Sequence, residues 1–421
     1  MNDVLKYSLE QLDMLDEKNP TGLMRVQNIT KIASSKHSVE EIIALENAGD
    51  YKADYIYFRR FQNRPSIPQV YIYDFTSKAD VIEADIILLH QRLYSSGSVP
   101  MFFVITKKDI RIFNCFEKPA KGDKLVYKPL TTISLASHVS ELLTREQLQN
   151  DQKFQAFSGK SLDNGSFWEN SSYSAKFEFS NSAYEKLLSE LKQALKDIVD
   201  RDILPQPLAK KLMVMSILIK YLEERTDEHN NSVFPKRDEE RISIVGGKKI
   251  KVKYQANFFE KFVPAATCFS DILKVTGAAL ELFDYLARHF NGGVFSLSTD
   301  ERNALKTTDL SRFSLFLEGN LEGVQFVFWR LYSFNDLPVE LISNIYEEFL
   351  EKKPGVVYTP PYLVSFLLDE SMPFTDLNTD FKILDPACGS GVFLVGAYRR
   401  LIYRWRLAHN LGIIRKVATH S

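Results

Sequence analysis

The sequence predicts an α/β plus α fold class: a mixed α/β domain first, a helical middle, and the beginning of a second, doubly wound α/β domain. Three observations carry this prediction. Strand, helix and hairpin patterns follow one another before residue 115, apolar residues recur at helical spacing after residue 183, and a strand, a glycine turn and a helix follow from residue 381. The expected parts are an N-terminal domain at 1–157, a linker at 158–182, a helical domain at 183–350 and an α/β segment at 351–421.

The N-terminal domain is expected to contain a strand, a helix and a hairpin in that order. Residues 69–74 alternate and are rich in β-branched and aromatic side chains, which predicts a strand. Residues 82–93 have helical spacing. Two further apolar runs, 101–106 and 109–114, predict a hairpin that turns at Lys107 and Lys108.

Bulk composition is typical of a soluble globular protein. The 421 residues are 45% hydrophobic and 25% charged, with a formal net charge of −1. No run approaches the roughly 20 apolar residues of a membrane helix, and the charged N-terminus lacks a signal-peptide pattern, so we expect a cytoplasmic protein. A net charge of −1 excludes a chain that is polybasic throughout, but one part of the chain can still have a basic face.

The middle of the chain is expected to be helical. The linker at 158–182 is inferred from its Ser and Asn content, and 226–241 reads as a charged surface loop. Helices are expected over residues 187–198, 208–225 and 271–290, and a hairpin over 241–245 and 249–254 around two glycines. The three cysteines, Cys115, Cys268 and Cys388, lie far apart, which predicts free thiols and neither a disulfide framework nor a metal site.

The last segment carries the residues that point to chemistry. Residues 381–384 predict a short buried strand, with Asp385 at its carboxyl end and a helix from about 392 to 405. Between them, Gly389 and Gly391 allow a tight turn and a close approach of a ligand to the backbone. The N-terminus of the helix favours a carboxylate and Asp385 favours an ammonium group, which together suit the amino-acid end of S-adenosyl-L-methionine. A dinucleotide fingerprint would require a third glycine where Leu394 stands.

Residues 385–391 read DPACGSG and are followed by Val392 and Phe393. This string resembles the cofactor motif of amino-type DNA methyltransferases, above all the adenine-N6 class. The family also has a Tyr-Thr-Pro element at about this distance upstream, matched here by residues 358–360, although Thr359 is equally placed to cap the next helix. The resemblance implies that S-adenosylmethionine is bound by Tyr358, Thr359, Pro360, Asp385, Pro386, Ala387, Gly389, Ser390, Gly391 and Phe393. Cys388 is interpreted as a small turn residue, because the family uses no thiol nucleophile.

Two upstream strings, 216–225 and 337–349, resemble bacterial restriction–modification enzymes of the type I and type IIG-like kinds. The resemblance therefore extends over about residues 205–410 and is sharpest at 337–400. It implies DNA as a partner and direct attack of a flipped adenine on the cofactor's methyl group.

The family's second motif, Asn- or Asp-Pro-Pro-Tyr, is absent from these 421 residues. The nearest string starts at Thr359 and precedes the glycine turn, so no catalytic residue is assigned. No acidic residue that would hold the cofactor ribose follows the helix in 407–421. We therefore expect the N-terminal part of a methyltransferase, inactive alone, whose remaining sheet lies on a second polypeptide or was lost to a premature stop. A non-catalytic, truncated methylase that binds DNA or a partner is the alternative.

The N-terminal domain leaves three interpretations open. Its strand, helix and hairpin follow the order of a nuclease domain, but the Glu-x-Lys signature is missing. A magnesium-dependent nuclease would have to use Asp54, Asp74 and Glu83; a nuclease-like scaffold without catalysis and an unrelated docking domain are the alternatives. Two basic, aromatic-rich segments, at 58–64 and 398–406, either contact phosphate or form solvated faces.

Overall fold

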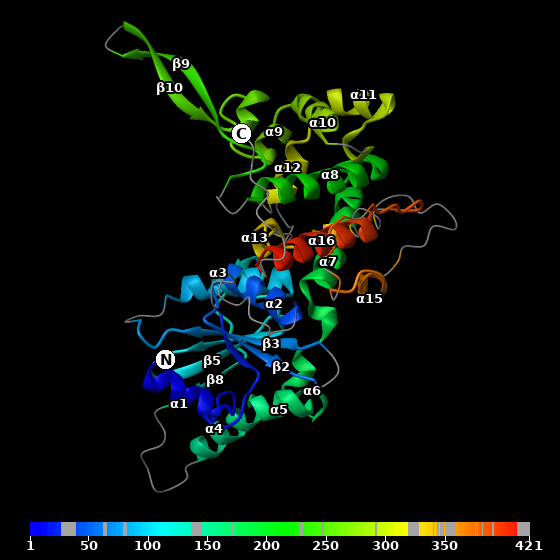
Figure 1. Cartoon of the computed structure of the whole chain (residues 1–421). Helices are drawn as coiled ribbons and strands as arrows, with labels where there is room; N and C mark the ends of the chain where they lie inside the picture. The colour runs from blue at the N-terminus through cyan, green and yellow to red at the C-terminus, as the bar shows by residue number, and fades with distance from the viewer. Residues whose placement is uncertain are drawn as a thin grey trace. The chain divides into compact units, whose positions relative to one another are not determined.

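A computed structural model describes the chain except for residues 27–38, 62–64, 79–81, 136–144, 171, 227–230, 246–247, 291–292, 319–327, 340, 343–344, 346–348, 350–358, 360, 375, 377, 381, 390 and 411–421. The chain divides into two compact units (Figure 1). The first unit comprises Met1–Lys121, Leu125–Glu185 and Gly355–Ser421, and the second comprises Gly122–Lys124 and Lys186–Pro354.

A mixed six-stranded sheet organises the first unit. Its spatial order is β1 (Leu23–Arg25), β2 (Tyr55–Arg59), β3 (Ile67–Asp74), β4 (Met101–Ile105), β5 (Asp109–Asn114) and β8 (Thr131–Ser134). Only β3 and β4 pair in parallel, because α3 (Glu83–Ser96) connects them as a crossover helix. The predicted strand, helix and hairpin of 69–114 are thereby confirmed, and the turn at Lys107 and Lys108 joins β4 to β5.

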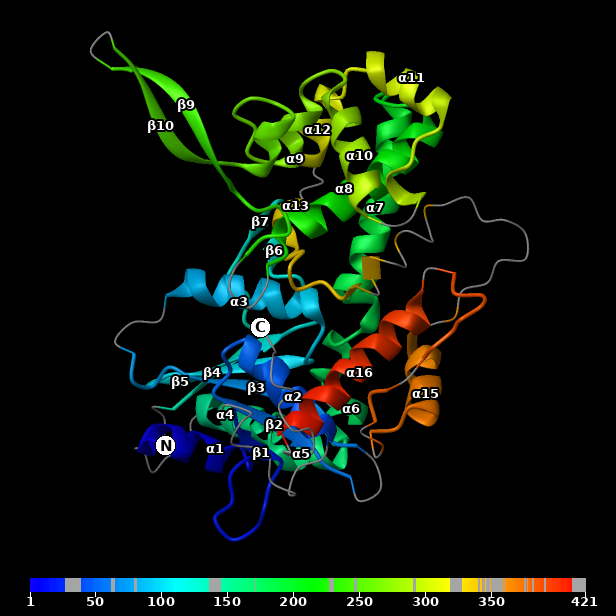
Figure 2. The same cartoon turned by 45° about the horizontal axis from the view of Figure 1, so that its top comes forward.

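Helices cover both faces of this sheet, as Figure 2 shows. The helices α1 (Asp3–Gln11), α4 (Arg145–Ala156), α5 (Gly159–Asn164) and α6 (Ser166–Asn170) lie on one face, and α2 (Val39–Asp50) and α3 on the other. Successive residues of each strand alternate between the two cores: Phe103 belongs to the first and Phe102 to the second. The central strands are therefore buried on both sides and read as continuous apolar runs.

The described residues of 158–182 are folded, in contrast to the predicted linker. They form α5, α6 and the 3-10 turns η2 (Ser174–Lys176) and η3 (Phe179–Asn181), and Leu162 and Phe167 are fully buried against the sheet. The Ser and Asn content that suggested a linker marks helix ends instead. Ser158 accepts a hydrogen bond from Ser161 N at the start of α5, and Gly165, with φ 84°, ends it.

The second unit is predominantly helical, as predicted. Its elements are α7 (Ala183–Asp200), α8 (Gln206–Glu224), β9 (Arg237–Val245), β10 (Lys248–Ala256), η4 (Phe258–Lys261), α9 (Phe269–Leu273), α10 (Ala278–His289), η5 (Gly293–Phe295), α11 (Thr299–Thr307), α12 (Ser311–Glu318) and α13 (Phe328–Leu331). A short ladder of β6 (Ala120–Lys121) and β7 (Lys124–Leu125) lies where the two units divide the chain. In the helix expected at 337–349, Leu341, Ile345 and Phe349 are helical and buried at four-residue spacing.

Two predictions in this unit are wrong in their boundaries. The helix expected at 271–290 is divided into α9 and α10, because Gly277 adopts φ 82° immediately before α10. A charged loop was expected at 226–241, but residues 237–241 belong to strand β9. The ladder between β9 and β10 is therefore longer than the hairpin predicted from the apolar residues.

The last described segment contains α15 (Pro361–Ser371) and α16 (Val392–Asn410). Within the described residues, no helix has both the length and the apolar character needed to cross a membrane.

Candidate functional site

The glycine turn at the start of α16 is the centre of the candidate site. Gly389 and Gly391 adopt φ 54° and 80°, a left-handed conformation that side-chain-bearing residues rarely accept. Gly391 N donates to Cys388 O over 2.7 Å, and Gly391 O then accepts from Val395 N at 2.9 Å, which begins the helical ladder. A Cβ at residue 391 would meet no atom of the described residues within 4 Å, so among these residues open space borders this backbone. The predicted turn and helix are confirmed.

Asp385 lies at the entrance to this turn. Its Oδ1 accepts a hydrogen bond from Ala387 N at 3.1 Å, which fixes the carboxylate beside the backbone two residues ahead. The Asp385 side chain is partly buried, whereas Pro386, Ala387 and Gly389 are exposed, and Phe393 is partly buried on the first turn of α16. The carboxylate and the helix N-terminus are thus joined by a short exposed loop.

The buried strand predicted at 381–384 is not formed by its described residues. Residues 382–384 have no strand hydrogen bonding; Ile383 is 42% exposed and Leu384 is 86% exposed. The physical reason is that a strand is stabilised by a neighbouring strand, and the described residues that follow 354 supply none.

The upstream element lies before α15. This helix begins at Pro361, and a proline is well suited to a first helical position. Thr359, two residues earlier, is partly buried. The other members of the Tyr-Thr-Pro element, Tyr358 and Pro360, lie outside the described residues, as does Ser390 of the glycine turn.

Helices α15 and α16 pack closely at a glycine. A Cβ at Gly396 of α16 would lie 2.5 Å from Leu368 Cδ1 and 3.8 Å from Val364 Cγ1, both on α15. Gly396 therefore allows the two helices to approach each other, which places the helix that follows Thr359 against the helix that follows the glycine turn.

Two arginines of α16 hold the connection that leads from α15 towards the turn. Arg404 is 1% exposed and donates from Nη2 to Pro373 O at 2.8 Å and from Nη1 to Asn378 O at 3.1 Å. Arg400 donates to Met372 O at 2.9 Å and pairs with Asp369. The phosphate-contact interpretation therefore does not fit these two residues. Their i, i+4 spacing was the sequence signal for one shared face.

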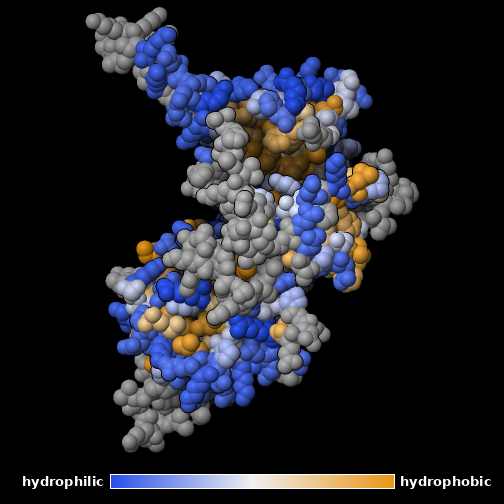
Figure 3. Space-filling view, viewed as in Figure 1, coloured by the Kyte–Doolittle hydropathy of each residue, from blue (hydrophilic) through white to orange (hydrophobic). Residues whose placement is uncertain are grey.

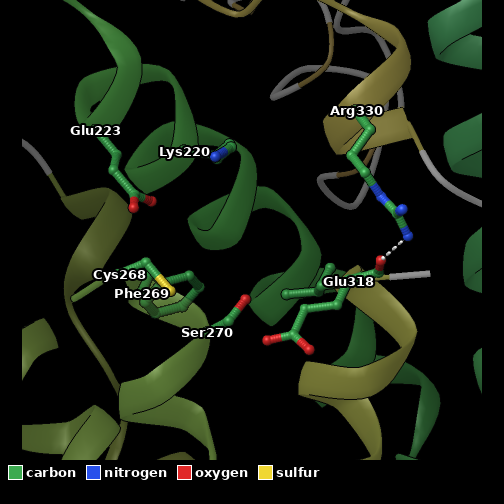
Figure 4. A pocket seen from close by; sticks show the side chains of 8 residues that line it. Lys220, Glu223, Cys268, Phe269, Ser270, Glu318 and Arg330 are labelled. Carbon is green, nitrogen blue, oxygen red and sulfur yellow. Dashed lines mark hydrogen bonds between the residues drawn. The ribbon is translucent and has the colours of Figure 1, made fainter. Parts of the chain in front are cut away.

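The second unit contains a cavity of about 350 Å³ that the sequence did not predict (Figure 4). Three of its charged lining residues have protein partners: Lys220 lies 3.0 Å from Glu224, and Glu318 lies 2.8 Å from Lys274 and accepts from Arg330 through its backbone oxygen. Burial raises the pKa of Cys268 and so opposes thiolate formation. We therefore assign no reaction to the cavity. The sequence feature that could have indicated it is the presence of charged residues, Lys220 and Glu223, within the predominantly apolar helix α8.

The N-terminal acids form a structural pair. Asp54 Oδ2 accepts from Asp74 N at 2.7 Å, and Asp74 Oδ1 accepts from Thr76 N at 3.0 Å. Thr76 occupies the position where Glu-x-Lys would place its lysine. Burial raises the pKa of Asp54. The searched residues, those that the structure describes, hold no group of three or more His, Cys, Asp or Glu that could bind a metal ion. The magnesium site suggested for Asp54, Asp74 and Glu83 is therefore not formed.

Comparisons with known proteins agree with the position of the candidate site. Residues 339–412 match the model of the N-6 DNA methylase family, and this range includes α15, the glycine turn and α16. The resemblance read from the sequence is supported over this range. No solved structure gives a significant match.

Two curated proteins are similar to parts of the chain. One is the type II restriction enzyme and methyltransferase RM.BcgI of Heyndrickxia coagulans, 27% identical over 203 residues that cover 46% of this chain and 27% of that protein. The other is the methylase subunit of the type I restriction enzyme MjaVII of Methanocaldococcus jannaschii, 33% identical over 72 residues, 16% of this chain and 12% of that subunit. The matched segment spans only a minor part of either relative. Both of these relatives are methyltransferase or methylase components of restriction enzymes by their names.

Proposed function

We propose that the chain supplies the cofactor-binding start of an adenine-N6 DNA methyltransferase of a restriction–modification system. The observation that carries the proposal is the turn from Asp385 to Gly391. It combines a fixed carboxylate, two glycines in the left-handed conformation and the N-terminus of the 19-residue helix α16, inside the range matched by the methylase family.

The described residues fit the amino-acid end of S-adenosylmethionine. An ammonium group pairs with a carboxylate such as that of Asp385, and a carboxylate is favoured by the backbone N–H groups at the N-terminus of a long helix. The open space beside Gly391 leaves room for a ligand against the backbone. When bound, the cofactor would supply an electrophilic methyl group.

Each residue would then have a binding or positioning role. Asp385 would hold the ammonium group, the backbone of Gly389, Ser390 and Gly391 would accommodate the carboxylate, and Phe393 with Pro386 and Ala387 would shape the entrance. Residues 358–360, at the head of α15, would close over the same end of the ligand. The packing of Gly396 against Leu368 supports this arrangement, because it ties α15 to α16.

The target adenine would be held by residues that this chain does not contain. The Asn- or Asp-Pro-Pro-Tyr motif is absent from its sequence, and the exposed Ile383 and Leu384 precede the turn without a neighbouring strand among the described residues. The relatives are several times longer than their matched segments. We infer that methyl transfer requires further methyltransferase sequence, on a second polypeptide or a continuation, which pairs with residues 381–384 and binds DNA.

Calorimetric titration of the full chain with S-adenosylmethionine tests the cofactor role. We expect uptake that Gly389→Val abolishes and that Asp385→Asn weakens about tenfold, the loss of about 1.4 kcal/mol expected for one charge-assisted contact. Gly97→Val is the matched control, because Gly97 has φ 60°, close to the 54° of Gly389, and ends α3 in another part of the chain.

Equal affinity in the wild type and Gly389→Val would refute the assignment of the turn. Absence of uptake by the wild-type chain would refute its cofactor role and favour the non-catalytic alternative, a truncated methylase that binds DNA or a partner. Gly97→Val should retain the affinity of the wild type, and its loss would show that strain at any glycine unfolds the chain.

A further inference from the structure

We propose that the β9–β10 hairpin is a DNA-contacting arm whose basic stretch, residues 241–253, lies along the phosphates of duplex DNA. This inference rests on the proposed function only in taking DNA as the partner. It assigns a DNA contact to the helical unit, far in sequence from the methylase match at 339–412.

The hairpin is long, and among the described residues its two strands pair only with each other. Nine residues of β9 pair antiparallel with nine of β10, from Arg237 opposite Ala256 to Val245 opposite Lys248. At about 3.4 Å per residue, each strand extends for about 30 Å. Both views show the hairpin leaving the helices of its own unit (Figures 1 and 2).

Charge is distributed unequally along this arm. The two strands contain six cationic residues and three acidic ones. All three acids, Asp238, Glu239 and Glu240, lie at the root, and residues 241–253 contain none. The cations of that acid-free stretch are Arg241, Lys248, Lys249, Lys251 and Lys253.

The exposed side chains among the described residues of the arm are Asp238, Glu240, Lys251, Lys253 and Gln255. Lys251 and Lys253 are two residues apart on β10, so they share a face, and both are exposed. Lys251 Nζ lies 3.4 Å from Glu240 Oε2, with the lysine side chain 75% exposed, so this ion pair is weak and can be exchanged for a phosphate. The described part of the arm is hydrophilic on the face shown in Figure 3.

The root of the arm is packed against the residues that flank the two strands. Phe234, just before β9, stacks on Phe258, just after β10, with ring centroids 4.5 Å apart. Asn257 and Glu260 form a reciprocal cap at the start of η4, directly after β10. A two-stranded ribbon is marginally stable by itself, and these contacts support the ribbon at its base.

Duplex DNA fits this combination of shape and charge. The major groove, about 12 Å wide, admits a two-stranded ribbon, and its walls present about one negative charge per 1.7 Å of helix axis. Cations beyond residue 240 would meet phosphates, whereas the acids at the root would keep phosphates away from the helices. Exposed lysines on edge strands also prevent pairing with other proteins' strands, which argues against a β-augmentation partner.

The test is binding of the full chain to fluorescent duplex DNA across salt concentrations, measured by anisotropy. We expect Lys251→Ala/Lys253→Ala to lower the affinity and to reduce the slope of log K against log salt by about 2, close to 0.9 for each lost phosphate contact. The matched control, Lys196→Ala/Lys306→Ala, removes two exposed cations from α7 and α11 of the same unit and should leave the slope unchanged.

A second variant protects the test against misfolding. Glu240→Gln removes the carboxylate that competes for Lys251, so we expect its affinity for DNA to rise. An unchanged slope in Lys251→Ala/Lys253→Ala, or equal effects of the control pair, would overturn the proposal. Binding of the arm to anionic phospholipid vesicles but not to DNA would overturn it as well. These variants should still bind S-adenosylmethionine. Loss of DNA binding therefore tests the arm, and loss of S-adenosylmethionine binding tests the cofactor site.

Discussion

His90 of α3 donates through Nε2 to the carbonyl oxygen of Asn114, at the end of β5, over 2.8 Å. The ring is buried and meets Phe102 and Phe113 edge to face, with centroids 5.5 and 5.6 Å away. This bond ties the crossover helix to the end of β5, the neighbour of the edge strand β8. Because burial disfavours the charged imidazole, the pKa of His90 falls to about 4.

The first prediction concerns acid stability. An unfolded histidine has a pKa of about 6.5, so the unfolded state takes up the proton first as pH falls. The stabilisation from neutral His90 is present above about pH 6.5 and is lost between there and about pH 4, at about 1.4 kcal/mol per pH unit and about 3 kcal/mol in total. His90→Gln, which keeps a donor, should unfold in urea with a shallower pH dependence. Identical dependence in both proteins would contradict the buried neutral state.

The second prediction concerns the packing of α5 under the sheet. A Cβ at Gly159 would lie 2.4 Å from Asp13 O and 2.5 Å from Tyr57 Oη, which itself bonds Asp163 at 2.8 Å. Gly159→Ala should therefore lower the free energy of unfolding by about 3 kcal/mol. Gly97→Ala, with open space around it, should cost about 1 kcal/mol from its left-handed backbone alone. Equal costs in chemical denaturation would show that 158–182 is not packed as described.

The third prediction concerns Arg404. Its guanidinium holds Pro373 O and Asn378 O in a buried position. Arg404→Ala should remove about 2 kcal/mol of local stabilisation and accelerate amide exchange in residues 372–380, measured by mass spectrometry. Arg406→Ala is the control, because Arg406 lies on the same helix but is 43% exposed, and its ion pair with Glu46 is long at 3.5 Å. If amide exchange in residues 372–380 were the same in Arg404→Ala as in the wild type, Arg404 would not stabilise this segment.

The fourth prediction concerns catalysis. The purified chain, given labelled S-adenosylmethionine and unmethylated duplex DNA, should transfer no methyl groups, because its sequence lacks the motif that holds the target adenine. Addition of a polypeptide that carries Asn- or Asp-Pro-Pro-Tyr and completes the sheet should restore transfer. Clear methyl transfer by the chain alone would refute the proposal that catalysis requires further methyltransferase sequence.

The sequence predicted elements best where local periodicity and burial agreed. The runs of β3, β4 and β5 and the helices α7 and α8 were all expected, because their apolar residues recur at one clear period. Residues 158–182 were not expected to fold, because serine and glycine are common both in linkers and at helix ends. Ser158 and Gly165 cap the two ends of α5. Local patterns do not reveal which turns are buried.

The candidate site was predicted in its turn and helix but not in its strand. The glycines before α16 specify their backbone conformation locally. A strand at 381–384, in contrast, depends on a neighbouring strand, which residue types within the segment cannot specify. The roles of Arg400 and Arg404 depend on backbone carbonyls about 30 residues away, and sequence spacing shows only that the two residues share a face.

The exposure of Leu384 connects assembly to ligand affinity. Leu384 directly precedes Asp385, so any polypeptide that covers this leucine also restricts the carboxylate beside it. If covering residue 384 raises the affinity of the turn for its ligand by some factor, the ligand must strengthen that association by the same factor. An unassembled chain would then bind the proposed ligand more weakly, and the ligand would in turn favour the assembled state.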